Sequence, residues 1–149
     1  MEGEQTAIYQ ITRGDDPSCE RRVVGQILVV DDSAENRTLL TNILSVRGYS
    51  VTTAPDGILA WNLLQQSGDS YGLVITDLMM PRLNGLELLE RVRAAYPWIK
   101  VVLVTGHLDE AITSRARRLG AFAVLPKPCE LKQLYGIIRR ALPHSPTIG

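Results

Sequence analysis

The 149-residue chain has few cysteines, no net charge and no long apolar run. Its two cysteines, Cys19 and Cys129, are too few for the disulfide framework of a small secreted domain, so we expect free thiols in a reducing cytoplasm. With 16 basic and 16 acidic residues, the chain has no basic excess that would favour direct nucleic-acid binding. Its apolar runs are only strand-sized and predict no membrane span, and its acidic start does not resemble a secretory signal.

Hydrophobic residues make up 45% of the chain, which is enough for the core of one globular domain. Residues 1–25 show no strong periodicity and are interpreted as an N-terminal extension, tail or linker. Residues 26–142 are interpreted as one folded domain, and residues 143–149 as a C-terminal tail. Because no further domain fits after Leu142, we expect either a stand-alone protein or a fragment of a longer one.

Apolar, strand-like runs alternate five times with segments of helical periodicity, which is typical of an α/β fold. Such alternation favours a doubly wound parallel sheet with helices on both faces. The strands are expected at residues 27–30, 50–54, 72–77, 99–105 and 121–125. The helices are expected to begin near Ser33, Asp56, Gly85, Asp109 and Leu131. The fourth helix is expected to share one stripe made of Leu108, Ile112, Ala116 and Leu119. Pro126 cannot donate to a neighbouring strand, so the last strand is expected at a sheet edge.

Polar residues follow four of the predicted strands: Asp31 and Asp32, then Asp77, Thr105 and Lys127. The carboxyl ends of parallel strands form the ligand crevice of an open α/β sheet, so we expect these side chains to meet there. Three crowded carboxylates need a cation to stay ionised, and their oxygens suit Mg²⁺ better than zinc. A free carboxylate beside that metal could attack phosphorus and form an acyl phosphate, while the ammonium and the hydroxyl donate to phosphoryl oxygens.

In their order and spacing, these motifs resemble the receiver (CheY-like) domain of two-component response regulators. The likeness runs over residues 26–142 and rests on Asp31-Asp32, Asp77 to Pro81, Asn84-Gly85, Val104 to Gly106 and Leu125 to Pro128. It implies a flavodoxin-like (βα)5 fold with a five-stranded sheet in the order 2-1-3-4-5. It also implies a phosphorelay function, in which the domain accepts a phosphoryl group from the phosphohistidine of a histidine kinase and switches a protein-interaction surface.

The resemblance gives each acid at the predicted site a separate role. Asp77 matches the phosphoacceptor and is also a metal ligand. Asp32 matches the main metal-binding acid, and Asp31 its neighbour, which acts mostly through water. Met79 would give its backbone carbonyl to Mg²⁺, while its side chain is free to vary.

The resemblance also assigns the two predicted donors. Thr105 matches the switch hydroxyl that moves toward the phosphoryl group, and Lys127 matches the lysine that binds a phosphoryl oxygen. The peptide bond between Lys127 and Pro128 is expected to be cis, as is usual at this position of the family.

One position departs from the family pattern. The family often has Tyr or Phe three residues before the lysine, where this chain has Val124. Phe122 is two residues too early, and we expect it on the same strand face at a different height. His107 matches a variable position beside the site, where a side chain can orient or exclude water.

Two partner surfaces follow from the resemblance. A histidine kinase or phosphotransfer protein is expected to dock on the first helix, near Arg37 and Leu40. A downstream protein target, or a fused output domain, would read the face formed by the fourth helix, the fifth strand and the fifth helix. That face is also the expected surface of a possible homodimer, and neither surface implies direct contact with nucleic acid or membrane.

Other interpretations remain open at this point. A phosphorylation-independent interaction module would keep the fold and lose the chemistry. The domain is not expected to be an enzyme beyond its own phosphorylation and autodephosphorylation, because an aspartyl phosphatase often has a second acid where this chain has Met79. The glycine-rich motifs of nucleotide-binding proteins do not occur.

Overall fold

The computed structural model describes residues 26–142. The predicted N-terminal extension, tail or linker (residues 1–25, with Cys19) and the predicted C-terminal tail (residues 143–149) lie outside the described residues. The described part holds five strands, five α-helices and one short 3-10 helix. In chain order they are β1 (Gln26–Val30), α2 (Ala34–Val46), β2 (Ser50–Ala54), α3 (Gly57–Ser67), η1 (Gly68–Ser70), β3 (Leu73–Asp77), α4 (Gly85–Ala95), β4 (Lys100–Thr105), α5 (Glu110–Arg118), β5 (Ala123–Pro126) and α6 (Leu131–Ala141). None of these helices is long and apolar enough to cross a membrane.

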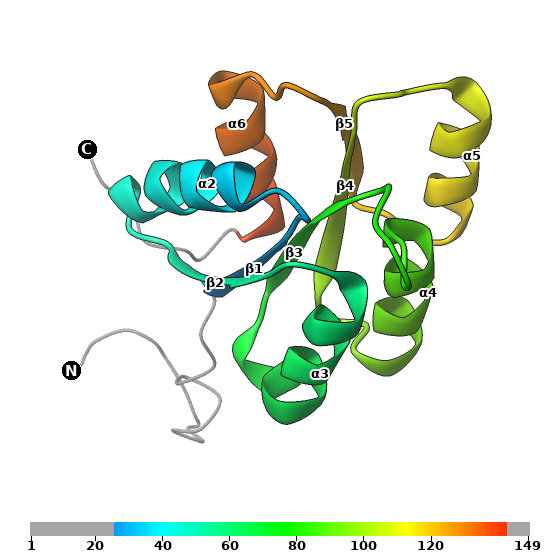
Figure 1. Ribbon diagram of the computed structural model, residues 1–149, viewed down its shortest axis with the longest axis horizontal. Coiled ribbons are helices and arrows are strands. Elements are labelled where there is room, and N and C mark those ends of the chain that lie inside the picture. The colour runs from blue at the N-terminus through cyan, green and yellow to red at the C-terminus, as the bar shows by residue number, and fades with distance from the viewer. Residues whose placement is uncertain (1–25, 143–149) are drawn as a thin grey trace.

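The sheet has the order β2-β1-β3-β4-β5, and every neighbouring pair is parallel. Helices α2 and α6 cover one face, and α3, α4 and α5 cover the other (Figure 1). This arrangement confirms the predicted doubly wound fold and its strand order. As expected from Pro126, β5 lies at an edge of the sheet.

The central strands are apolar throughout because both of their faces are buried. In β1, Leu28 and Val30 pack with α3 and α4, whereas Ile27 and Val29 pack with α2 and α6. All four side chains are buried. The polar residues that follow such strands are therefore placed at the rim of the sheet by two buried layers.

Each helix that follows one of the first four strands begins with a side-chain cap. The cap oxygen accepts the backbone N–H of the residue three positions later, which satisfies one of the unpaired donors of the first turn. The four caps are Ser33, Asp56, Asn84 and Asp109, with the bonds to Asn36, Leu59, Glu87 and Ile112. The predicted caps at Ser33 and Asp56 are confirmed.

Two predictions about side-chain placement are wrong. Leu108 is not part of a buried stripe: it precedes α5, is 46% exposed, and leaves Ala116 as the buried residue of that helix. Phe122 does not share a face with Val124, because it packs with the α2 and α6 side while Val124 packs on the opposite side. The alternation fails there because β5 begins only at Ala123.

Candidate functional site

Three acids meet at the carboxyl ends of two neighbouring strands. Asp31 and Asp32 follow β1, and Asp77 is the last residue of β3. The two strands pair in register with Val30 opposite Thr76, so their ends lie side by side. Each acid offers one carboxylate oxygen, and these oxygens all lie within 4.8 Å of one another. Asp31 and Asp77 are buried and Asp32 is exposed, so the cluster opens to solvent on one side.

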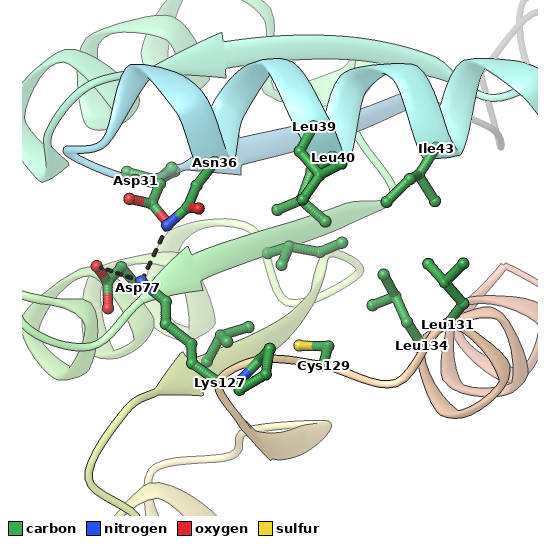
Figure 2. A pocket seen from close by; sticks show the side chains of 14 residues that line it. Asp31, Asn36, Leu39, Leu40, Ile43, Asp77, Lys127, Cys129, Leu131 and Leu134 are labelled. Atoms are coloured by element: carbon green, nitrogen blue, oxygen red, sulfur yellow. Dashed lines mark hydrogen bonds and ion pairs between the residues drawn. The ribbon is translucent and has the colours of Figure 1, made fainter.

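Lys127 joins this cluster from the loop after β5. Its Nζ donates to Asp77 Oδ2 at 3.0 Å and to Asp31 Oδ2 at 3.2 Å, as the dashed lines in Figure 2 show. Its backbone N–H donates to the carbonyl of Thr105 at 2.9 Å, which ties the loop to the end of β4. The peptide bond between Lys127 and Pro128 is cis, as predicted. The predicted acids and the predicted lysine are therefore brought together.

Asp31 is held by the first turn of α2, a contact that the sequence pattern did not predict. The backbone N–H of Ser33 donates to Asp31 Oδ1 at 2.8 Å, and the Asn36 amide donates to Oδ2 at 3.3 Å. The guanidinium of Arg37 donates to the Asp31 carbonyl at 2.7 Å. The position of Asn36, five residues after the acid and in the first turn of α2, is the signal that could have indicated this contact.

The two other predicted residues lie beside the acids. Thr105 is the buried last residue of β4, and its Oγ1 accepts the backbone N–H of His107 at 3.1 Å. Met79 lies two residues beyond Asp77 with an exposed side chain, and its backbone N–H donates to the Asp77 carboxylate. Met79 thus borders the cluster from the loop that follows β3, and Thr105 borders it from the end of β4.

The charges at the site are unequal. Burial raises the pKa of Asp77 above its ordinary value, although the hydrogen bond and charge of Lys127 oppose the rise. Burial alone would lower the pKa of Lys127, but its bonds to Asp77 and Asp31 raise it overall. Three carboxylates face one ammonium, so negative charge is in excess. Their oxygens are hard ligands of the kind that suits a divalent cation.

A cavity of about 300 Å³ opens from this cluster between α2 and α6. Asp31, Asp77 and Lys127 form its polar end, and aliphatic side chains of α2 and α6 form its walls (Figure 2). Cys129 also lines the cavity as a free, half-buried thiol. Burial raises the pKa of this thiol against the opposing charge of Lys127, so the group behaves as part of the apolar wall.

Comparison with known proteins gives a consistent family assignment. The family model of the response regulator receiver domain matches residues 27–139. The chain is 36% identical over 117 residues to the DNA-binding transcriptional regulator NtrC of Azospirillum brasilense, covering 78% of this chain and 24% of that protein. It is 36% identical over 118 residues to the transcriptional regulatory protein FixJ of Bradyrhizobium diazoefficiens, covering 79% and 57%. It therefore spans less than two thirds of the length of these relatives.

Solved structures agree with this assignment. A response regulator receiver domain protein from Clostridium thermocellum superposes with a TM-score of 0.76 at 30% identity, covering 80% of this chain and 94% of the other. The receiver domain of NtrX from Brucella abortus gives a TM-score of 0.72 at 34% identity, covering 80% and 99%. The chain thus belongs to the response regulator receiver domain family, and its function is that of a receiver in a two-component phosphorelay.

Proposed function

We propose that Asp77 is the residue that accepts the phosphoryl group from the phosphohistidine of a histidine kinase or phosphotransfer protein. One observation carries this assignment: three carboxylates lie within 4.8 Å of one another, and the Lys127 ammonium lies 3.0 Å from Asp77. Mg²⁺ would be held by Asp31, Asp32, Asp77 and the backbone carbonyl of Met79. The excess of hard carboxylate oxygens supports this choice of metal.

The reaction transfers a phosphoryl group from a nitrogen of the donor imidazole to a carboxylate oxygen of Asp77. An oxygen of Asp77 forms a bond to phosphorus as the bond from phosphorus to the donor imidazole breaks, and the imidazole leaves with the electron pair. Lys127 then donates to one phosphoryl oxygen, and the Thr105 hydroxyl moves to donate to another. Mg²⁺, when bound, supplies neutralisation of the charge on the phosphoryl oxygens.

The phosphorylated state would be reported on the face formed by α5, β5 and α6, the predicted fourth helix, fifth strand and fifth helix. Movement of Thr105 toward the phosphoryl group changes the loop that leads into α5. The same face would bind a downstream target, a fused output domain or a second copy of the chain. Val124 on β5 is half-buried against the α3 and α4 side, so no aromatic ring takes part at that position.

The test uses Mg²⁺ and a small phosphodonor, followed by intact mass measurement. We expect a single labile phosphoryl adduct that is absent after Asp77→Asn and absent when the metal is chelated. Asp109→Asn, which changes an exposed helix cap of the same chemistry, is the matched control and should label normally. Absence of any adduct, also with a cognate kinase, would favour a phosphorylation-independent module. Repeated turnover of an unrelated phosphate ester would instead indicate an enzyme.

The kinase or phosphotransfer protein is proposed to dock over α2 and the neighbouring cavity. Leu39 on α2 is 57% exposed and lines the cavity whose polar end is the acid cluster. Leu39→Ala should slow transfer from a phosphorylated donor protein and leave labelling by a small phosphodonor unchanged. Leu59→Ala, on the opposite face in α3, is the matched control. Equal rates for both variants would contradict this docking surface.

A cytoplasmic location is part of the same proposal. It is supported by the free thiol of Cys129, which persists in a reducing compartment. The catalytic activity proposed for the domain is limited to its own phosphorylation and autodephosphorylation.

A further inference from the structure

Arg82 has an unusual backbone conformation in the loop between β3 and α4. Its φ is 70°, the one positive value among the non-glycine residues that the structure describes. A side chain with a Cβ is disfavoured in this left-handed region, where glycine is the usual residue. The Leu83 N–H donates to the Pro81 carbonyl at 2.9 Å and closes a tight turn around Arg82, and a side-chain interaction adds to this turn.

The guanidinium of Arg82 supplies that interaction through an ion pair with Asp56. Asp56 is the buried cap of α3, and the two residues are 26 positions apart in the chain. Asp56 uses one carboxylate oxygen to accept the backbone N–H of Leu59 at 2.9 Å and the other to accept Arg82. The hydrogen bond from the Leu59 N–H and then the contact with Arg82 lower the pKa of Asp56, although burial opposes them. The pair is therefore ionised at neutral pH.

The same part of the loop packs closely on the first turn of α3. Leu83 is buried, and a Cβ added at Gly57 would collide with the Leu83 carbonyl oxygen. At its other end the loop is tied to the sheet, because the Leu78 N–H donates to the Val104 carbonyl at 3.0 Å. Met79 therefore lies between an anchor on the sheet and an anchor on α3.

We propose that Arg82 is a positioning residue for the phosphorylation reaction, because its ion pair with Asp56 holds the loop so that the Met79 carbonyl faces the metal. This inference rests on the proposed function, in which that carbonyl is a metal ligand. Without the ion pair, residue 82 keeps only the backbone bond from the Leu83 N–H to the Pro81 carbonyl, and the loop loses its charged attachment to α3. The metal then loses one well-placed oxygen.

The test compares the Mg²⁺ dissociation constants of variants of the loop and of one control by calorimetry. Arg82→Gly removes the guanidinium but accepts the positive φ, so backbone strain does not confuse the result. Asp56→Asn removes the charge but keeps a good helix cap. Asp109→Asn makes the same change at the cap of α5, which lies outside this loop, and serves as the control.

We expect Arg82→Gly and Asp56→Asn each to raise the Mg²⁺ dissociation constant about tenfold, as loss of a residue that orients a ligand does. The double variant should show no further loss of Mg²⁺ affinity, because the two changes remove the same ion pair. Arg82→Lys should recover part of the affinity, and Asp109→Asn should have none of these effects. Unfolding by urea is measured in parallel, since a purely structural role would change stability and leave the dissociation constant unchanged.

Dissociation constants within twofold of the parent protein for both variants would overturn the inference and leave the proposed function intact. Additive losses in the double variant would also overturn it. If the parent protein itself neither binds Mg²⁺ nor forms an adduct on Asp77, the proposed function fails, and the positioning role fails with it.

Discussion

Lys127 and Asp77 are 50 residues apart in the chain, yet the lysine ammonium lies 3.0 Å from the aspartate carboxylate. Their strands β5 and β3 are not neighbours, because β4 lies between them. The long lysine side chain spans the end of β4 and reaches Asp31 as well. One cation is therefore shared by two buried acids.

Replacing Lys127 separates metal binding from chemistry. Lys127→Met should tighten Mg²⁺ binding, because the carboxylates lose the ammonium that competes with the metal. The same change should slow adduct formation on the order of 100-fold, since the proposed donor to the phosphoryl oxygen is lost. Calorimetry and time-resolved intact mass would measure the two effects. Weaker Mg²⁺ binding together with an unchanged rate of labelling would contradict this prediction.

Asp77→Asn should stabilise the metal-free protein at neutral pH. Burial raises the folded-state pKa of Asp77 above its ordinary value of 3.8, so its ionised form is disfavoured in the fold. The gain should be complete above the folded-state pKa and disappear as pH falls below 3.8, where the carboxyl is protonated in both states. Urea unfolding across this pH range is the measurement, with Asp109→Asn as control. A loss of stability of Asp77→Asn at neutral pH would disprove this prediction.

Asp56→Asn should have the opposite effect on stability at neutral pH. The folded-state pKa of Asp56 lies below 3.8, chiefly because of the Leu59 N–H and then Arg82, so its carboxylate stabilises the fold at higher pH. The variant should therefore be less stable than the parent at neutral pH. The difference should shrink as pH falls below 3.8 and through the folded-state pKa. If both aspartate variants changed stability in the same direction at neutral pH, this account of their charges would be wrong.

Val124 should contribute packing and not signalling. Val124→Ala should cost about 1 kcal/mol of unfolding free energy, because a half-buried methyl pair is removed. Labelling and the phosphorylation-dependent NMR shifts of α5 and α6 should remain.

Thr105→Ala should still be labelled but should lose those NMR shifts, since its hydroxyl is the proposed link to the α5 loop. Loss of the shifts in Val124→Ala would instead place this residue in the signal path.

The sequence predicted the part of the site that depends on strand ends. Asp31, Asp77 and Lys127 each follow an apolar run, and parallel strands place such residues at one rim of the sheet. The caps at Ser33 and Asp56 were predictable because the capping oxygen and its donor are three residues apart. These features depend on local pattern together with one topological rule.

Contacts between loops were not predictable in this way. The ion pair of Arg82 with Asp56 joins two turns through no periodic pattern, and only the folded chain brings them together. The face occupied by Phe122 depends on where β5 begins, which is the least certain part of a strand assignment. Leu108 fits a helical stripe in sequence, but it precedes α5.

The bond from Lys127 to Asp31 closes a loop of 96 residues. Asp31 and Lys127 thus lie near the two ends of the described fold, and Asp77 lies between them. If the chain is cleaved between Asp31 and Lys127 and the two fragments separate, neither fragment holds the complete site. With Asp77 as the proposed phosphoacceptor, its labelling would measure folding of the whole domain, and the yield of adduct would count the correctly folded molecules in a preparation.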